Sequence, residues 1–329
     1  MKTLIALVLV LTVPFSLSCA RKIKVGPADA RVIAKNAYIY AYPIVENYKV
    51  MYAYAVYKDS GHFRAPFNTL AVVTPDTAKT DSAGHAVTRR PPYALAWIDL
   101  RKEPVVITVP PMKDGSHYDV QLIDLYTYHF DGLGTEKTGN AGGSFMIVPM
   151  DWSGKTPDKV TRVIGCETTF ALAIIRGHGS AGEATALTEN FLTAFDVDRL
   201  SAFEGTRAVT GDAQIFPPYS QETANSAGFF QYLNFALQFC PVHPSEIHER
   251  AEFAKLGIAA GKTFDVGYMD KAILDAVNAG MADARSEIDA AVAKTPAGQA
   301  KYGTRADLKN DFLARAVAAK ISLYGPAKM

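Results

Sequence analysis

One short segment, residues 117–129, concentrates side chains that could act on a ligand or hold one. His117 and Asp119 stand two residues apart, so in a strand they would share one face, where a carboxylate can orient an imidazole for base catalysis or join it as a metal ligand. A solvated strand surface explains the same pair, and we favour that simpler interpretation. Asp124 lies among apolar residues, where an unpaired carboxylate is costly, so we expect it to have a partner.

The same segment and its neighbours hold aromatic and polar side chains suited to a small molecule or a glycan. An aromatic ring offers an apolar face to such a ligand, and a few polar groups fix its orientation. A run of tyrosines between Tyr38 and Tyr57 could line the same site or simply pack a helix against a sheet. We predict a cleft between a β-sandwich and these helices, lined by Tyr93, Trp97, Tyr118, Gln121, Asp124, Tyr126 and Arg176.

Three classes of function stay open on these residues. The first is the binding protein just described, and the second is a hydrolase or lyase that uses Asp124, or the pair His117 and Asp119, as acid or base, with or without a divalent metal. The third is a structural or partner-binding protein. The common local signatures of hydrolases, zinc proteases and nucleotide-binding loops are missing, but catalytic groups on separate strands leave no such signature. The sequence indicates no particular cofactor and no metal-ligand set.

Charge, apolar content and cysteine content limit the classes of binding partner, the size of the core and the state of the thiols. The chain has 34 Lys and Arg against 33 Asp and Glu, so no strong field draws it to nucleic acid or to an anionic membrane. Apolar residues make up 49% of the chain, enough for a sizeable buried core. Cys166 and Cys240 either form a disulfide, as an oxidising compartment permits, or stay as buried thiols in apolar surroundings.

Residues 1–20 have the pattern of a signal peptide. Lys2 precedes an apolar run over residues 4–13 that is too short to cross a bilayer as a helix, and small residues lead to an expected cleavage after Ala20. We expect a periplasmic or secreted protein whose mature chain has no transmembrane segment. A lipoprotein modified at Cys19 is the less favoured alternative.

The spacing of apolar residues predicts the elements that would position these side chains. Helical spacing begins at Asp29, is interrupted at Pro43, and returns after Gly182 for most of the remaining chain. Short β segments without helices between them indicate an antiparallel sandwich or barrel rather than a doubly wound fold. The expected strands are Tyr93–Ile98, Val105–Val109, Tyr118–Leu125, Ser144–Val148, Val160–Ile164 and Thr169–Ile175.

Several blocks of sequence share an order that belongs to one family. They are Tyr93–Leu100, Glu103–Val106, Tyr118–Thr127, Gly134–Gly139, Phe145–Val148, Arg176, Phe229–Asn234 and Leu256–Asp265. Together they resemble the bacterial family called domain of unknown function 1254. The resemblance implies an immunoglobulin-like sandwich followed by a helical domain, often with a C-terminal jelly roll called domain of unknown function 1214, which is missing from this sequence.

The resemblance also has departures. The segment Arg89-Arg90-Pro91 stands where the family usually has Asn-Asp-Thr, and Glu136 replaces a usual arginine. If those positions form the family's working site, the site is altered here, and membership supplies no reaction. A second copy or a partner chain could dock where the jelly roll is missing.

We therefore predict an α+β protein. Its parts are a signal peptide over residues 1–20, a helical segment over 21–60, an immunoglobulin-like antiparallel β-sandwich over 61–178 and a mainly α-helical domain over 179–329.

Overall fold

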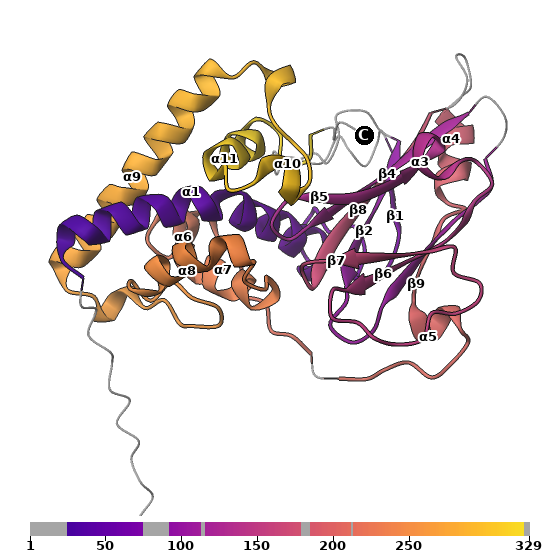
Figure 1. Cartoon of the computed structure of the whole chain (residues 1–329), viewed down its shortest axis with the longest axis horizontal. Coiled ribbons are helices and arrows are strands. Elements are labelled where there is room, and N and C mark those ends of the chain that lie inside the picture. The colour runs from indigo at the N-terminus through magenta and orange to yellow at the C-terminus, as the bar shows by residue number, and fades with distance from the viewer. Residues whose placement is uncertain (1–24, 75–91, 113–115, 179–184, 212, 326–329) are drawn as a thin grey trace, which may run out of the picture.

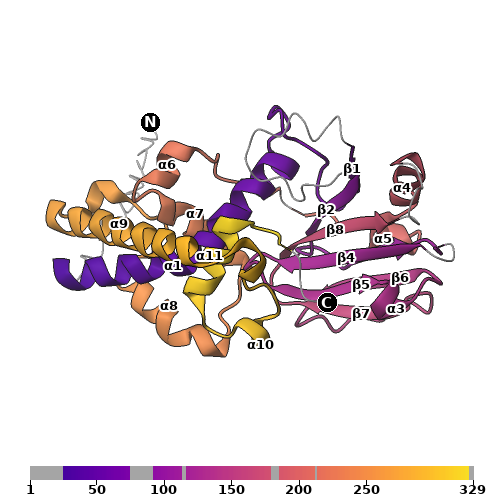
Figure 2. The ribbon, with the colours of Figure 1, turned by 90° about the horizontal axis from the view of Figure 1, so that it is seen from above.

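The computed structural model describes residues 25–74, 92–112, 116–178, 185–211 and 213–325. The expected signal peptide and the segment Arg89-Arg90-Pro91 lie outside these residues. Figures 1 and 2 show most of the helices gathered in one half of the molecule and two β-sheets in the other, packed side by side. The α+β class is confirmed by this arrangement.

The β half contains two sheets. The five-stranded sheet has the order β1-β2-β8-β4-β5 with antiparallel neighbours throughout, and the four-stranded sheet has the order β7-β6-β3-β9. The first is built from β1 (Ala71–Val73), β2 (Tyr93–Asp99), β8 (Phe170–His178), β4 (His117–Asp124) and β5 (His129–Gly134). The second is built from β7 (Arg162–Cys166), β6 (Gly143–Pro149), β3 (Val105–Val109) and β9 (Asp196–Arg199).

One pair of strands corrects the expected strand directions. The strands β6 and β7 run parallel, so the sandwich is not wholly antiparallel. The connection between them, residues 150–161, is long enough to carry the chain back to the start of the next strand instead of closing a hairpin. The strand β9 joins this sheet from residues 196–199, after the expected sandwich boundary at residue 178.

Alternation along the strands builds two cores at once. On β2, Ala94, Ala96 and Ile98 face the four-stranded sheet, whereas Tyr93 and Trp97 face the helices. The five-stranded sheet is therefore buried on both faces over much of its area. Its residues read as nearly continuous apolar runs for that reason.

Three strands have no counterpart in the sequence prediction: β1, β5 and β9. The strand β5 reads His-Phe-Asp-Gly-Leu-Gly, in which two glycines weaken the β signal. It is extended because the edge of β4 supplies its hydrogen-bond partners, from Asp119 opposite Gly134 to Ile123 opposite His129.

The first helix runs without interruption through Pro43, so the predicted break there is wrong. Helix α1 spans Pro27–Met51 and passes into a π-helical turn at Tyr52–Val56. Pro43 is buried, and α1 packs against helices on several sides. This packing outweighs the single backbone hydrogen bond that a proline removes.

The tyrosines of this segment mainly pack the helical core. Tyr38, Tyr40, Tyr48 and Tyr54 are buried, and Tyr57 is exposed.

The remaining helices surround α1 or cover the ends of the sheets. The longest, α9 (Lys271–Lys294), lies along α1 and is joined to it by exposed ion pairs such as Arg31 with Asp283. No helix of the described residues is long and apolar enough to span a membrane. The others are α3 (Thr135–Thr138), α4 (Thr185–Leu192), α5 (Leu200–Phe203), α6 (Gln221–Asn225), α7 (Phe229–Ala236), η2 (Leu237–Phe239), η3 (Pro244–Glu246), α8 (Ile247–Ala254), η4 (Val266–Tyr268), η5 (Ala297–Gln299), α10 (Arg305–Leu308) and α11 (Phe312–Ile321).

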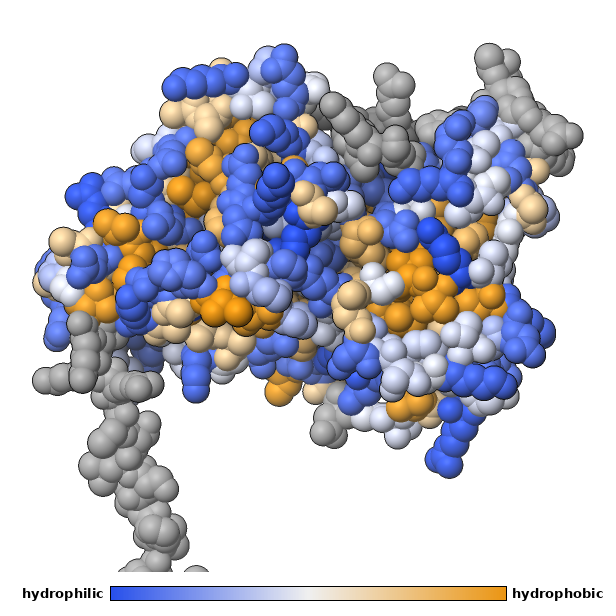
Figure 3. Space-filling model, viewed as in Figure 1, coloured by the Kyte–Doolittle hydropathy of each residue, from blue (hydrophilic) through white to orange (hydrophobic). Residues whose placement is uncertain are grey.

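The two sheets do not close into a barrel. The strands β5 and β7 are sheet edges on the same side of the sandwich, and a side chain bridges them, because Arg162 donates to the Gly132 carbonyl and pairs with Asp131 at 3.2 Å. Figure 3 shows a broad apolar area over the sheets on this side of the molecule.

The close approach of α1 and α9 generates a stability prediction. A Cβ at position 280 would collide with the main-chain carbonyl oxygen of Arg31, so Gly280→Ala forces the two helices apart. We expect the free energy of unfolding to fall by about 1–3 kcal/mol in chemical denaturation. Gly298→Ala, where a Cβ meets no atom within 4 Å, is the control and should change it little. Equal stability of the two variants would contradict this close packing.

Candidate functional site

Four polar side chains lie together on the face of the five-stranded sheet that is turned towards the helices. We call Asp119, Gln121, His129 and Arg176 the sheet cluster. Arg176 of β8 donates from Nη1 to Asp119 Oδ2 at 2.9 Å and from Nη2 to Gln121 Oε1 at 3.0 Å. The two β4 residues stand beside Arg176 because alternation puts Asp119 and Gln121 on one face, and the β4–β8 register pairs Asp119 with Arg176.

His129 completes this cluster from the neighbouring strand β5. Its ring lies 3.1 Å from Gln121 Nε2 and stacks on the Tyr302 ring at 5.7 Å between centroids. Burial, together with the positive charge of Arg176, lowers the pKa of His129 to about 4. The imidazole is therefore neutral at pH 7, and the ion pair of Asp119 and Arg176 leaves the whole sheet cluster without net charge.

The end of the described chain covers the sheet cluster. Gln121 Nε2 donates to the Gly325 carbonyl at 2.9 Å, and Tyr302 donates its hydroxyl to the Ser322 carbonyl at 2.7 Å. Tyr324 is buried and donates to Asn47 of α1 at 2.7 Å. We call residues 322–325 the C-terminal strap.

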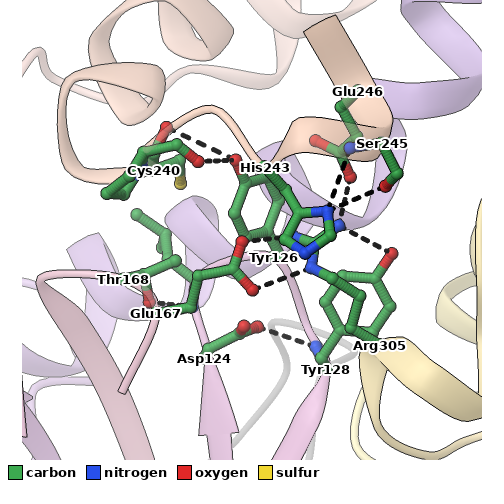
Figure 4. A network of polar contacts seen from close by, with 12 residues as sticks. Asp124, Tyr126, Tyr128, Glu167, Thr168, Cys240, His243, Ser245, Glu246 and Arg305 are labelled. Atoms are coloured by element: carbon green, nitrogen blue, oxygen red, sulfur yellow. Dashed lines mark hydrogen bonds and ion pairs between the residues drawn. The ribbon is translucent and has the colours of Figure 1, made fainter. Parts of the chain in front are cut away.

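A second polar network lies where the sheets meet the helices (Figure 4). Its centre is Arg305, at the start of α10. It holds Glu167 with two hydrogen bonds of 2.7 Å and also pairs with Glu246 of η3, whose side chain is fully buried. The guanidinium stacks over the rings of Tyr126 and Tyr128, at 4.7 and 4.4 Å from the centroids. We call this set the Arg305 network.

Two further arginines extend the Arg305 network. Arg250 donates to the hydroxyls of Tyr40 and Tyr126, and Tyr40 donates on to Glu246 at 2.8 Å. Arg315 of α11 donates to the Tyr126 carbonyl and stacks over Tyr128. Arg250 bonds to hydroxyls and Arg315 to a carbonyl and a ring, so the network is held by hydrogen bonds and stacking as well as by charge.

Asp124 borders this network at the end of β4. It is 1% exposed, and its Oδ1 accepts the Tyr128 N–H at 2.8 Å, closing the β4–β5 turn. Burial, reinforced by the negative charge of Glu167, raises its pKa to about 8. The expected partner of Asp124 is therefore mainly a backbone N–H, and the carboxyl group is largely protonated at neutral pH.

The structure divides the seven predicted ligand residues among three places. Gln121 and Arg176 lie in the sheet cluster, with Tyr93 and Trp97 buried on the same sheet face. Asp124 and Tyr126 belong to the turn beside the Arg305 network. Tyr118 points between the two sheets, where its hydroxyl meets Thr138 and Gly139.

The proposed catalytic pair is not formed as a pair. His117 is exposed at the start of β4, whereas Asp119 is bound to Arg176. Within the described residues, no group of three or more His, Cys, Asp or Glu side chains is placed to hold a metal ion. Cys166 and Cys240 are both buried free thiols, so the disulfide alternative is not realised, and burial raises both thiol pKa values.

Comparison with known proteins agrees with the sequence blocks in β2, β3, β4 and β6. Residues 67–197 match the family model described as "Protein of unknown function (DUF1254)". The resemblance to this family is confirmed over these residues. The matched range contains Asp119, Gln121, His129 and Arg176, but Arg305, Tyr302 and the C-terminal strap lie beyond it. No curated protein matches the chain.

One solved structure shares the fold. The VPA0106 protein from Vibrio parahaemolyticus aligns with a TM-score of 0.73 at 20% identity, covering 90% of this chain and 68% of its own. A putative uncharacterized protein from Burkholderia cenocepacia aligns over 41% of this chain and 36% of its own, with a TM-score of 0.28 at 17% identity. At these identities the first likeness concerns the fold alone.

Several residues of both sites escape prediction from the sequence. His129 follows the polar segment by position, but its role depends on the strand β5, which the pattern does not reveal. Arg305 has a local signal, because Thr304 and Asp307 form a capping box that marks a helix start. Nothing in the sequence connects it with Glu167 and Glu246, which lie 138 and 59 residues away.

The raised pKa of Asp124 predicts a pH effect on stability. The pKa of Asp124 in the folded state, about 8, lies above the ordinary 3.8. Its contribution to the free energy of unfolding is therefore full below about pH 4 and is lost as pH rises towards 8. Asp124→Asn, which still accepts the Tyr128 N–H, should therefore gain stability relative to the wild type between pH 5 and pH 9, compared by urea unfolding. A constant difference across this range would contradict the raised pKa.

The pairing of Arg305 with a fully buried carboxylate generates a second prediction. Arg305→Met leaves Glu246 fully buried without its countercharge, so we expect the free energy of unfolding to fall by about 3–5 kcal/mol. Arg31→Met breaks the exposed pair with Asp283 and should cost about 0–1 kcal/mol. Equilibrium denaturation of both variants tests this. Equal losses would mean that the Arg305 network does not hold the two halves together.

Proposed function

We propose that the chain is an exported binding protein for a small polar molecule or a glycan, and that the sheet cluster is its binding site. The supporting observation is the grouping of Asp119, Gln121, His129 and Arg176 on a sheet face that otherwise carries buried apolar residues. Burying such groups costs free energy unless they bond to one another or to a ligand. A few convergent polar groups on an apolar surface are typical of ligand sites.

The setting at the end of α1 supports the same site. The π-helical turn at Tyr52–Val56 brings Tyr54 near the C-terminal strap, where burial first and then the nearby Tyr54 raise the pKa of Tyr324. Single π-helical turns occur often at functional sites. The Tyr302 ring lies beside Gly325 of the strap and stacks on His129, so a ligand there would meet rings as well as polar groups.

The geometry favours binding over acid–base catalysis. A catalytic base works best with a pKa near the working pH, whereas the pKa of His129 is about 4. Asp124 has a suitable pKa, but it is 1% exposed and occupied by the Tyr128 N–H. A hydrolase using His117 with Asp119 would need the two side chains in contact, but His117 is exposed and Asp119 Oδ2 is held by Arg176.

Export remains part of the proposal on the strength of residues 1–20, whose charged start, apolar run and small residues are typical of a signal peptide. The expected location is the periplasm or the exterior of the cell.

The binding proposal is tested with a panel of neutral and acidic monosaccharides and small polar metabolites, screened by thermal shift and measured by calorimetry. Arg176→Met should lower the affinity for any compound that binds by at least about tenfold, which is about 1.4 kcal/mol of binding free energy. Arg31→Met removes an arginine–aspartate pair between α1 and α9, away from the sheets, and should leave binding unchanged. Unfolding midpoints confirm that both variants fold. The proposal fails if no panel member binds, or if both variants bind equally well.

A further inference from the structure

The sheet cluster already binds one carbonyl group, which comes from the chain itself. The Gly325 carbonyl accepts a hydrogen bond from Gln121 Nε2 at 2.9 Å, while the other end of the same amide, Oε1, accepts from Arg176. Arg176 therefore fixes which way the amide points, with its N–H donors towards the C-terminal strap. The group held there is a neutral peptide carbonyl.

The neighbouring strand leaves room for this approach. Gly132 of β5 stands opposite Gln121, and Gly134 stands opposite Asp119, so no side chain rises from β5 beside either polar residue. Glycine inside a strand often marks a place where a ligand or another backbone comes close. Here the backbone that comes close is Gly325.

The charge of the cluster decides which ligand would suit the same place. Arg176 is neutralised by Asp119, and His129 is neutral at pH 7. A carboxylate ligand would gain little from an arginine that is already paired, and it would lie near the negative Asp119. A neutral carbonyl needs only one N–H, which Gln121 can donate. It does not depend on the charge of Arg176 and is not repelled by Asp119.

We propose that the sheet cluster binds ligands through a neutral amide carbonyl, and that the C-terminal strap occupies this position in the free protein and competes with them. This rests on the proposed binding function and names its ligand class. N-acylated sugars and short peptides both carry the group. The apparent affinity for a ligand is the intrinsic affinity multiplied by the fraction of time for which the strap leaves the site open.

Gly325 and Tyr302 supply variants that loosen the strap. A Cβ at position 325 would collide with the Tyr302 ring, so Gly325→Ala pushes the strap away from Gln121. Tyr302→Phe removes the hydroxyl that bonds to the carbonyls of Ser322 and Ala318, which is a milder change. Gly298→Ala is the matched control, because its Cβ meets nothing within 4 Å.

The experiment compares probes that differ in one group, by calorimetry on the full chain. N-acetylglucosamine is set against glucose, acetamide against acetate, and the capped peptide acetyl-Leu-Tyr-Gly-amide tests the peptide source. We expect the amide member of each pair to bind at least about tenfold more tightly. Gly325→Ala should tighten amide binding by about tenfold, Tyr302→Phe by less, and Gly298→Ala not at all. Gln121→Leu should abolish the preference for amides in every background.

The outcomes separate this inference from the proposed function. Equal binding of N-acetylglucosamine and glucose, or a preference for acetate, overturns the amide class and leaves binding at the sheet cluster standing. Unchanged amide affinity in both strap variants overturns the competition. Binding of no probe by the wild type or by Gly325→Ala overturns the amide inference, and the proposed function falls with it only if the wider panel also fails.

Discussion

The pairing of Arg305 with Glu246 and Glu167 is the interaction on which the joining of the two halves depends. Glu246 comes from the helical half, Glu167 from the turn between β7 and β8, and Arg305 from a short helix near the C-terminal end. A fully buried carboxylate needs a countercharge, so separating these three segments costs a large amount of free energy. The stacking of Tyr126 and Tyr128 on Arg305 ties the β4–β5 turn to the same point.

The geometry of the sheet cluster depends on the same segment that carries Arg305. Tyr302 stands three residues before Arg305, and the Gly303 carbonyl accepts the His129 N–H at 3.0 Å. The segment that places Arg305 therefore also places the aromatic cover of the cluster, because the Tyr302 ring stacks on His129. Moving α10 would move Tyr302 and, with it, the C-terminal strap.

The two polar regions differ in how their charges are used. The Arg305 network combines partly buried ion pairs with aromatic stacking, and its bordering carboxyl group, Asp124, is kept largely protonated by burial. The sheet cluster is smaller and has one ion pair, a neutral imidazole and an amide whose direction is set by Arg176. The first arrangement suits holding elements together, and the second suits recognising a neutral polar group.

The sequence by itself determined the α+β class, the resemblance of residues 67–197 to the DUF1254 family and the face on which Asp119 and Gln121 lie, because these follow from local spacing and from ordered blocks of residues. Alternation in β4 is enough to put both side chains beside each other. Only the tertiary structure decided that Pro43 stays inside a helix, that His129 begins a strand, and that Arg305 meets Glu246. Each of these depends on partners that are distant in the chain, and burial against those partners outweighs the local preferences that a sequence displays.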